Sequence, residues 1–269
     1  MKTLVTHINP HLDDIAAIWL FKKFHPDFKD AKIEFISASR DAAKEESEDK
    51  IFLGTGGGKF DEHKEGLDTC ATSLVFEYLK KEKYLPEDEI SQKALEKLIE
   101  WNRLIDTGKA PESQFDEFSI QAFIRTKDGS HKTSNKSVEL GVEILERILA
   151  VLKRKQQSLK DWGGRQEFST KFGRSFAVVS ETINREFCRE QGGDLFLMYN
   201  PKHESVQFFT PSFDIDLEPV YNRLKILDPE ASWFLHQSHH MVICGSASAP
   251  DSKPTKLSFE QLVTIIKSI

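Results

Sequence analysis

The segment from residue 3 to residue 24, "TLVTHINPHLDDIAAIWLFKKF", restricts the fold more than any other part of the sequence. Its opening run "TLVTHI" is rich in β-branched residues and predicts a strand, and "DDIAAIWLFKKF" predicts an amphipathic helix. A strand that leads directly into a helix is typical of α/β proteins. The polar turn between them therefore lies at the carboxyl end of a strand, where open α/β sheets place their ligand sites.

The rest of the first half continues the alternation of strands and helices. We expect two more strands, at residues 32–37 and 50–55, and helices at residues 69–83, 89–105 and 116–125. The polar stretch over residues 126–137 predicts a loop. A long helix is then expected at residues 138–162, where two consecutive glycines end it.

The second half has its own set of short apolar runs. They predict strands at residues 175–180, 194–200, 205–210 and 239–245 and helices at residues 217–227 and 258–269. The predicted fold class is α/β, with a parallel sheet and flanking helices in the amino-terminal domain, a long connecting helix, and a smaller α/β carboxy-terminal domain. The three parts are predicted to span residues 1–130, 131–163 and 164–269.

The composition limits the setting in which such a chain works. Of 269 residues, 39% are apolar and 30% are charged, which is enough for two ordinary folded domains. The three cysteines form no paired motif, no secretory signal is recognised, and no apolar stretch is long enough to span a membrane. We therefore expect a cytoplasmic protein with no membrane partner, of undetermined oligomeric state.

The net charge of −6 argues against broad, non-specific nucleic-acid binding, which requires a basic face. It leaves room for a phosphate-containing small molecule or a short single-stranded nucleic acid that is held locally.

The turn after the first predicted strand holds a dense set of metal-ligand side chains: His7, His11, Asp13 and Asp14. Histidines mixed with carboxylates suit manganese, iron, zinc or magnesium, and the carboxylates favour the harder ions. The alternative is that Asp13 or Asp14 only stabilises the start of the following helix. Two histidines and two aspartates within eight residues favour the metal site.

Three further segments carry candidate site residues. "LGTGGGKFDEHKEG" combines a glycine turn with Asp61, Glu62 and His63, and "LIDTG" places Asp106 at the end of a helix that Gly108 stops. In "WFLHQSHHMVICGS" we assign His236 to substrate contact and not to metal coordination.

The order of these motifs resembles the DHH phosphoesterase superfamily, whose members have a histidine and two aspartates, then Asp-His-His, then Asp-Thr-Gly. His7 and Asp13 match the first motif, with His11 at its first aspartate, and "FDEH" and "DTG" match the later ones. Within the superfamily, "TH", "H.D" and the glycine turn are most similar to the MYG-type (melanocyte-proliferating-gene) branch of metal-dependent hydrolases and exonucleases.

This resemblance implies a DHH-like phosphoesterase domain that hydrolyses phosphodiester bonds of a nucleotide or short oligonucleotide, as a 3′–5′ nuclease would. It implies one or two Mn²⁺ or Mg²⁺ ions, with Zn²⁺ as a third candidate. The implied metal ligands are His7, His11, Asp13, Asp61, Glu62 and Asp106. His63 and Asp14 are the implied catalytic residues, with His63 contacting the phosphate or protonating the leaving oxygen. The substrate contacts would be His236, Arg125, Lys127 and the turn at Ser246.

The sequence departs from the superfamily pattern at two positions. The aspartate that bridges two metals in the superfamily is replaced by Gly54 or Thr55, neither of which can bridge. The first histidine of Asp-His-His is Glu62, which can still coordinate a metal. These departures predict either one metal in place of two or a site without hydrolytic activity.

Two other functions compete with phosphoester hydrolysis. "PHLDD" closely resembles the opening motif of LmbE-type zinc deacetylases, with His11 and Asp14 as zinc ligands and Asp13 as the base. That alternative leaves His7 and the "FDEH" segment without a role. The third hypothesis is a non-catalytic metal-binding or nucleotide-binding protein that kept the fold.

Overall fold

A computed structural model describes residues 1–63, 68–125 and 129–269 of the chain. The chain divides into two compact units, Met1–Lys153 and Arg154–Ile269. Both units combine helices with a sheet, so the predicted α/β class is confirmed. The predicted connecting segment over residues 131–163 coincides with helix α5 (His131–Trp162) and the turn after it, and the boundary between the units falls within that helix.

The first unit is built on a parallel sheet whose described strands have the order β2-β1-β3. They are β1 (Thr3–His7), β2 (Lys32–Ile36) and β3 (Lys50–Phe52). Both neighbours run parallel to β1, with Val5 opposite Glu34 on one side and opposite Phe52 on the other. The carboxyl ends of the strands therefore share one edge, as the sequence predicts for the site.

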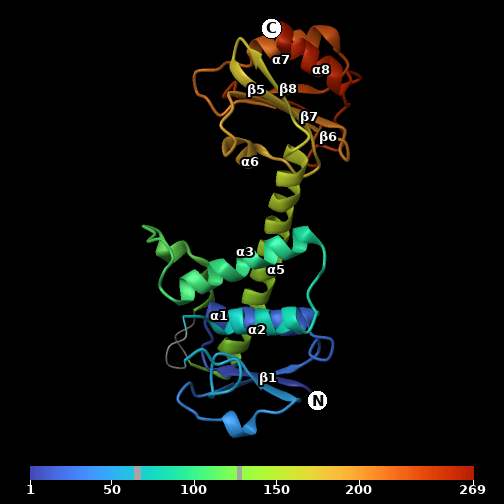
Figure 1. Ribbon diagram of the computed structural model, residues 1–269. Coiled ribbons are helices and arrows are strands. Elements are labelled where there is room, and N and C mark those ends of the chain that lie inside the picture. The colour runs from blue at the N-terminus through green and yellow to red at the C-terminus, as the bar shows by residue number, and fades with distance from the viewer. Residues whose placement is uncertain (64–67, 126–128) are drawn as a thin grey trace. The chain divides into compact units, whose positions relative to one another are not determined.

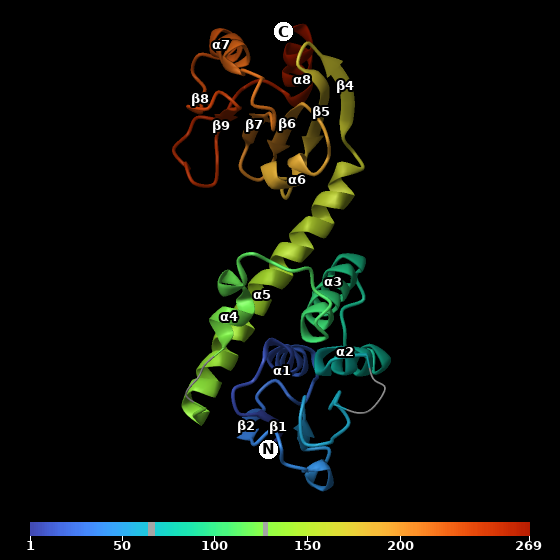
Figure 2. The ribbon, with the colours of Figure 1, turned by 90° about the vertical axis from the view of Figure 1, so that its left-hand side faces the viewer.

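Helices cover one face of this sheet. The described helices are α1 (Leu12–Phe24), α2 (Ala71–Lys81), α3 (Glu89–Asp106), α4 (Ile120–Ile124) and α5. Figures 1 and 2 show α1 and α2 side by side across the sheet, with α3 packed on them from the other side. Leu4 of β1 and the apolar side chains of these helices form one core.

The prediction that α1 is amphipathic is wrong. Every residue from Leu12 to Phe21 is buried, because the helix packs between the sheet and helices α2, α3 and α4. Helix α5 covers another part of the α1 surface, where Gly141 lies against Ile15. The charged residues Lys22 and Lys23 are confined to the last turn. Among the described residues, no helix is both long enough and apolar enough to cross a lipid bilayer.

The prediction of a loop up to residue 137 is also wrong in part, because α5 begins at His131. The serines that made this stretch look like a loop are buried and form tertiary contacts. Ser137 Oγ donates to the Ile124 carbonyl at 2.9 Å, and Ser134 Oγ accepts from the Asn9 amide at 3.0 Å. Residues 126–128 of the predicted loop lie outside the described residues.

The second unit contains a six-stranded mixed sheet of order β4-β5-β6-β7-β9-β8. Its strands are β4 (Gln166–Thr170), β5 (Gly173–Val179), β6 (Leu195–Asn200), β7 (Ser205–Phe209), β8 (Trp233–Leu235) and β9 (Met241–Cys244). The four predicted strands are present as β5, β6, β7 and β9. The two edge strands, β4 and β8, are additional.

Each face of this second sheet has its own core. Helices α7 (Glu218–Leu227) and α8 (Phe259–Ser268), both predicted from the sequence, cover one face. The short helix α6 (Arg185–Arg189) and Trp162 at the end of α5 cover the other face (Figure 2).

The contact between α1 and α5 predicts an unusual response to a helix-favouring substitution. Alanine is favoured over glycine in a helix by about 1 kcal/mol. A Cβ atom at Gly141 would lie 2.7 Å from Ile15 Cγ2, however, and such overpacking costs about 1–3 kcal/mol. We therefore expect Gly141→Ala to lower the free energy of unfolding measured in urea. The control is the same change in an Ile15→Ala background, where it should be neutral or stabilising; equal effects in both backgrounds would contradict the packing argument.

Candidate metal centre

A cavity of about 1000 Å³ opens at the carboxyl edge of the first sheet. It is lined by all the catalytic and metal-ligating residues predicted in the first unit: His7, His11, Asp13, Asp14, Asp61, Glu62, His63 and Asp106. These residues come from three separate stretches of the sequence, residues 7–14, 61–63 and 106. The structure therefore brings the predicted residues together, while their individual roles remain predictions.

The turn between β1 and α1 places His7 and His11 on the same side of the chain. Asn9 adopts a left-handed backbone conformation with φ of 58°, which reverses the chain between the two histidines. Asparagine tolerates this conformation better than most residues. The two imidazole rings meet edge-on with centroids 5.2 Å apart. His7 Nδ1 lies 2.8 Å from its acceptor, the Ile8 carbonyl, which directs Nε2 into the site.

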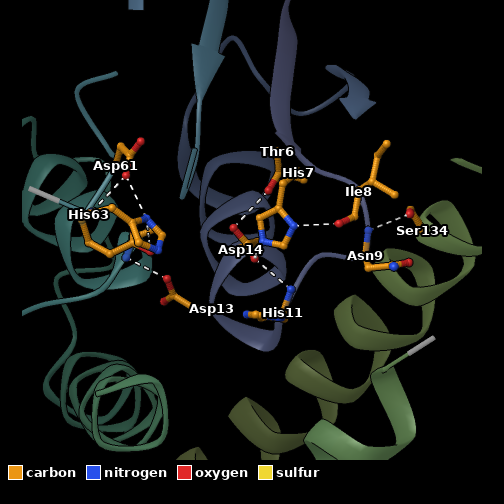
Figure 3. A network of polar contacts seen from close by, with 12 residues as sticks. Thr6, His7, Ile8, Asn9, His11, Asp13, Asp14, Asp61, His63 and Ser134 are labelled. Carbon is orange, nitrogen blue, oxygen red and sulfur yellow. Dashed lines mark hydrogen bonds and ion pairs between the residues drawn. The ribbon is translucent and has the colours of Figure 1, made fainter. Parts of the chain in front are cut away.

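Asp14 lies at the centre of this turn (Figure 3). Its Oδ1 accepts from Thr6 Oγ1 at 3.0 Å, and its Oδ2 accepts from the His11 amide at 2.8 Å. His7 Nε2 is 3.0 Å from the same Oδ2. His7, His11 and Asp14 each offer a ligand atom, and the three atoms lie within 4.8 Å of one another. We call these residues the histidine triad.

The protonation of the two histidines differs. Burial lowers the pKa of His7, but the hydrogen bond and charge of Asp14 outweigh it and raise the pKa to about 9. The metal-free protein therefore holds a protonated His7, and a metal ion would have to displace the Nε2 proton. Burial lowers the pKa of His11, so this ring is neutral and ready to coordinate.

Asp13 is turned away from Asp14 and towards the start of helix α2. Its Oδ2 accepts from the Ala71 amide at 2.7 Å, and its Oδ1 accepts from the Thr72 amide at 3.0 Å and from Asn102 Nδ2 at 2.7 Å. Asp13 thus stabilises the amino terminus of α2, and Asp14 binds an amide at the start of α1. The structural alternative drawn from the sequence, stabilisation of the following helix, therefore holds for Asp14. For Asp13 it is wrong about the helix, because Asp13 binds the start of α2 and not of α1. Both aspartates also belong to ligand groups.

A second ligand group consists of carboxylates alone. Oxygen atoms of Asp13, Glu62 and Asp106 lie within 4.8 Å of one another, and we call them the carboxylate triad. Asp106 is the last residue of α3, and the predicted stop at Gly108 is confirmed by its left-handed φ of 68°.

Burial and mutual repulsion act strongly on the carboxylate triad. Burial and the charges of Asp13, Asp14 and Asp106 raise the pKa of Glu62 to about 8. Burial and the charges of Asp13 and Asp14 raise the pKa of Asp106 to about 6. Among the described residues, Glu62 Oε2 is buried and has no hydrogen-bond partner, and no lysine or arginine lines the cavity. Oxygen ligands that repel one another fit a divalent metal ion.

Asp61 organises the glycine turn beside the triads. Its Oδ2 accepts from the Gly57 amide at 2.7 Å, and its Oδ1 accepts from the His63 amide at 3.0 Å. These two amides outweigh the effect of burial and lower the pKa of Asp61. His63 Nδ1 lies 3.0 Å from Asp61 Oδ1, and the His63 side chain is 72% exposed. Asp61 forms a ligand group with Glu62 and His63 but is in neither triad.

The surroundings of Gly54 leave no room for a carboxylate side chain at residue 54. A Cβ atom at this position would lie 2.1 Å from Asp14 Oδ1, and the backbone has a left-handed φ of 64°. The Asp14 carboxylate thus occupies the space that a side chain at residue 54 would need. Thr55 is buried, and its Oγ1 has no hydrogen-bond partner among the described residues.

Three residues of the site were missed in the sequence: Thr6, Thr72 and Asn102. All are buried and contact Asp13 or Asp14. Asn102 could have been recognised from the sequence, because it lies four residues before Asp106 and therefore on the same face of a helix. Thr6 and Thr72 look like ordinary strand and helix residues.

Arg125, His236 and Ser246, which the sequence analysis assigned to substrate contact, are not among the residues that line the cavity. Arg125 is exposed, and its positive charge reaches His11, where it contributes to the lowered pKa. Lys127 lies outside the described residues. His236, whose Nδ1 is 2.9 Å from Ser238 Oγ, and Ser246 belong to the second unit. Their contact with substrate stays a prediction.

The close approach at Gly54 predicts a specific effect on metal binding. We expect Gly54→Ala to displace Asp14 and to weaken Mn²⁺ binding at the histidine triad by at least about tenfold, measured by calorimetry on chelator-stripped protein. Gly57→Ala is the matched control, because Gly57 also has a left-handed φ of 73° but the nearest atom to its Cβ would be 3.6 Å away. Equal losses in the two variants would show that backbone strain alone is responsible.

The repulsion within the carboxylate triad predicts how stability depends on pH in the absence of metal. The pKa of Glu62 in the folded protein, about 8, exceeds its ordinary value of 4.5, so the folded state binds the proton more tightly. Its contribution to stability is present below pH 4.5 and is lost as the pH rises towards 8. We expect wild-type protein in chelator to lose more stability than Glu62→Gln between about pH 5 and pH 8. Parallel urea-unfolding profiles for the two proteins would contradict this.

Comparison with known proteins adds no functional assignment. The sequence matches no protein-family model and no curated protein. Among solved structures, the chain is similar to an uncharacterized protein from Helicobacter pylori G27, at 12% sequence identity and a TM-score of 0.29, over 100% of this chain and 99% of that chain. A likeness this weak carries no argument about fold or function, so the function must be argued from the geometry of the cavity.

Proposed function

We propose that the protein is a metal-dependent phosphoesterase that cleaves phosphodiester bonds in a nucleotide or short single-stranded oligonucleotide. One observation carries the proposal: the histidine triad and the carboxylate triad line one open cavity at the carboxyl edge of a parallel sheet. Two neighbouring ligand groups are the arrangement expected of a two-metal site that holds both the attacking and the leaving oxygen.

The two triads differ in chemistry, which supports manganese as the first choice. The histidine triad offers two imidazole nitrogens and one carboxylate, and the carboxylate triad offers oxygen alone. Mn²⁺ accepts both kinds of ligand, Mg²⁺ suits the carboxylate triad, and Zn²⁺ suits the histidine triad. Bound ions would lower the pKa of water and neutralise the charge of the substrate phosphate. In this assignment Asp14, predicted from sequence as catalytic, serves as a ligand.

The chain's own residues have separable roles in this chemistry. Asp61 holds His63 Nδ1 at 3.0 Å, which leaves Nε2 as the nitrogen that can give a proton to the leaving oxygen. An imidazole can hold and release a proton near neutral pH. Arg125, whose charge acts on His11, is the cation that we assign to the substrate phosphate.

A second candidate, a single-zinc deacetylase, is favoured by one observation. The histidine triad alone supplies three protein ligands, the number found in many catalytic zinc sites that keep a fourth position open. His7, which the deacetylase motif leaves without a role, belongs to this triad. Asp13 is a poor base for that chemistry, because three hydrogen-bond donors already occupy its carboxylate.

A hydrolysis screen with Mn²⁺ separates these functions. The substrates are short 3′-labelled RNA and DNA, small phosphodiesters and an N-acetylated sugar. We expect phosphodiester cleavage that falls by at least about a hundredfold in His11→Ala and in Asp106→Asn, because each change removes a ligand from one triad.

The matched control is His239→Ala. His239 forms a group with Asp216 and Glu218 in the second unit, so it has similar neighbours but no place in the cavity. Its activity should equal that of the wild type. Release of acetate would replace the phosphoesterase by the deacetylase. Inactivity on every substrate, together with retained Mn²⁺ binding, would leave a non-catalytic metal-binding protein.

A further inference from the structure

Asn102 occupies an unusual position for an amide side chain. It lies on α3, one helical turn before Asp106, and is only 1% exposed. Its Nδ2 donates to Asp13 Oδ1 at 2.7 Å and to Thr72 Oγ1 at 3.0 Å. Asn102 therefore connects the helix that ends in one ligand of the carboxylate triad to another ligand of the same triad.

The direction of these hydrogen bonds is fixed. Both carboxyl oxygens of Asp13 already accept backbone amides, from Ala71 and Thr72, so the group of Asn102 that faces Asp13 has to be the amide NH₂. Thr72 Oγ1 donates its own hydrogen to the Asp13 carbonyl at 2.8 Å, so it accepts from Asn102. Turning the amide over would place Asn102 Oδ1 against Asp13 Oδ1, and two acceptors would repel each other.

Only the nitrogen end of the Asn102 amide has hydrogen-bond partners among the described residues. Asn102 Oδ1 is buried and has no hydrogen-bond partner among the described residues. A buried carbonyl without a hydrogen-bond partner is unfavourable, and an apolar side chain at residue 102 would avoid this cost. The contact with Asp13 is what Asn102 supplies and an apolar side chain would not.

We propose that Asn102 is a positioning residue that holds the Asp13 carboxylate in the orientation needed to bind a metal ion with Glu62 and Asp106. The inference rests on the proposed metal centre. The Ala71 and Thr72 amides hold Asp13 from α2 alone, and Asn102 adds a contact from α3. Donors on two helices set both the plane of the carboxylate and its distance from Asp106. An oxygen atom of Asp13 held in this way lies within 4.8 Å of the ligand atoms of Glu62 and Asp106.

The test is calorimetric titration of chelator-stripped protein with Mn²⁺. Asn102→Ala, with Asn102→Ser as the second variant in case the first does not fold, should weaken binding at the carboxylate triad by about 10- to 100-fold, the range found when the partner of a metal ligand is removed. Binding at the histidine triad should not change. Leu98→Ala is the matched control, because it also removes a buried side chain from the same helix face but does not touch Asp13.

Exchanging the two residues separates positioning from simple hydrogen bonding. The double variant Asp13→Asn/Asn102→Asp keeps one carboxylate and one amide at this contact but moves the carboxylate out of the triad. We expect it not to recover the Mn²⁺ affinity that Asp13→Asn loses.

Three results would overturn the proposal: unchanged Mn²⁺ affinity in folded Asn102→Ala or Asn102→Ser, an equal loss in Leu98→Ala, or recovery of Mn²⁺ affinity in the exchanged variant. Wild-type protein that binds no Mn²⁺ would refute the metal centre itself, and the inference with it.

Discussion

The buried carboxylate of Asp13 is the contact on which the first unit depends. It belongs to the first turn of α1, accepts two amides from the start of α2 and accepts the amide of Asn102 on α3. A buried charge is tolerated only when its hydrogen-bonding capacity is satisfied, so these donors are required once Asp13 is placed there. Three helices are thereby held in register by a side chain that also faces the cavity.

The cavity itself is an electrostatically unfavourable arrangement without an ion. Asp13, Asp14, Glu62 and Asp106 lie close enough for the pKa values of Glu62 and Asp106 to rise well above their ordinary range. His7 offsets part of this charge by staying protonated against Asp14. Perturbed pKa values of this kind cluster at functional sites, and structural ion-pair networks also produce them.

Much of this arrangement could be predicted from the sequence, because the chemistry and the chain reversals are local. The β1–α1 turn carries His7, His11, Asp13 and Asp14 within a few residues, and strand periodicity places it at the edge of a sheet. Glu62 lies in the loop between β3 and α2, and Asp106 is the last residue of α3. The cavity gathers all of them, as the order of motifs predicts.

What could not be predicted depends on tertiary packing. The sequence "DDIAAIWLFKKF" has polar residues at both ends, and only the structure shows that other elements bury α1 on every side. Thr6 and Thr72 are common in strands and helices, and their contacts with Asp14 and Asp13 join residues that are 8 and 59 positions apart. The edge strands gave little signal, because β4 (QEFST) is mostly polar and exposed and β8 (WFL) is only three residues long.

Asp13 and Asp14 connect the stability of the fold to the proposed binding of a metal ion. Each carboxylate binds an amide at the start of a helix and each offers a ligand atom to a triad. An ion that binds only the folded chain adds about 2.7 kcal/mol of stability at a free concentration one hundred times its Kd. Under the proposed function, the folded fraction would therefore rise and fall with the supply of free divalent ion. Scarcity of the ion would then reduce the amount of folded protein as well as its proposed activity.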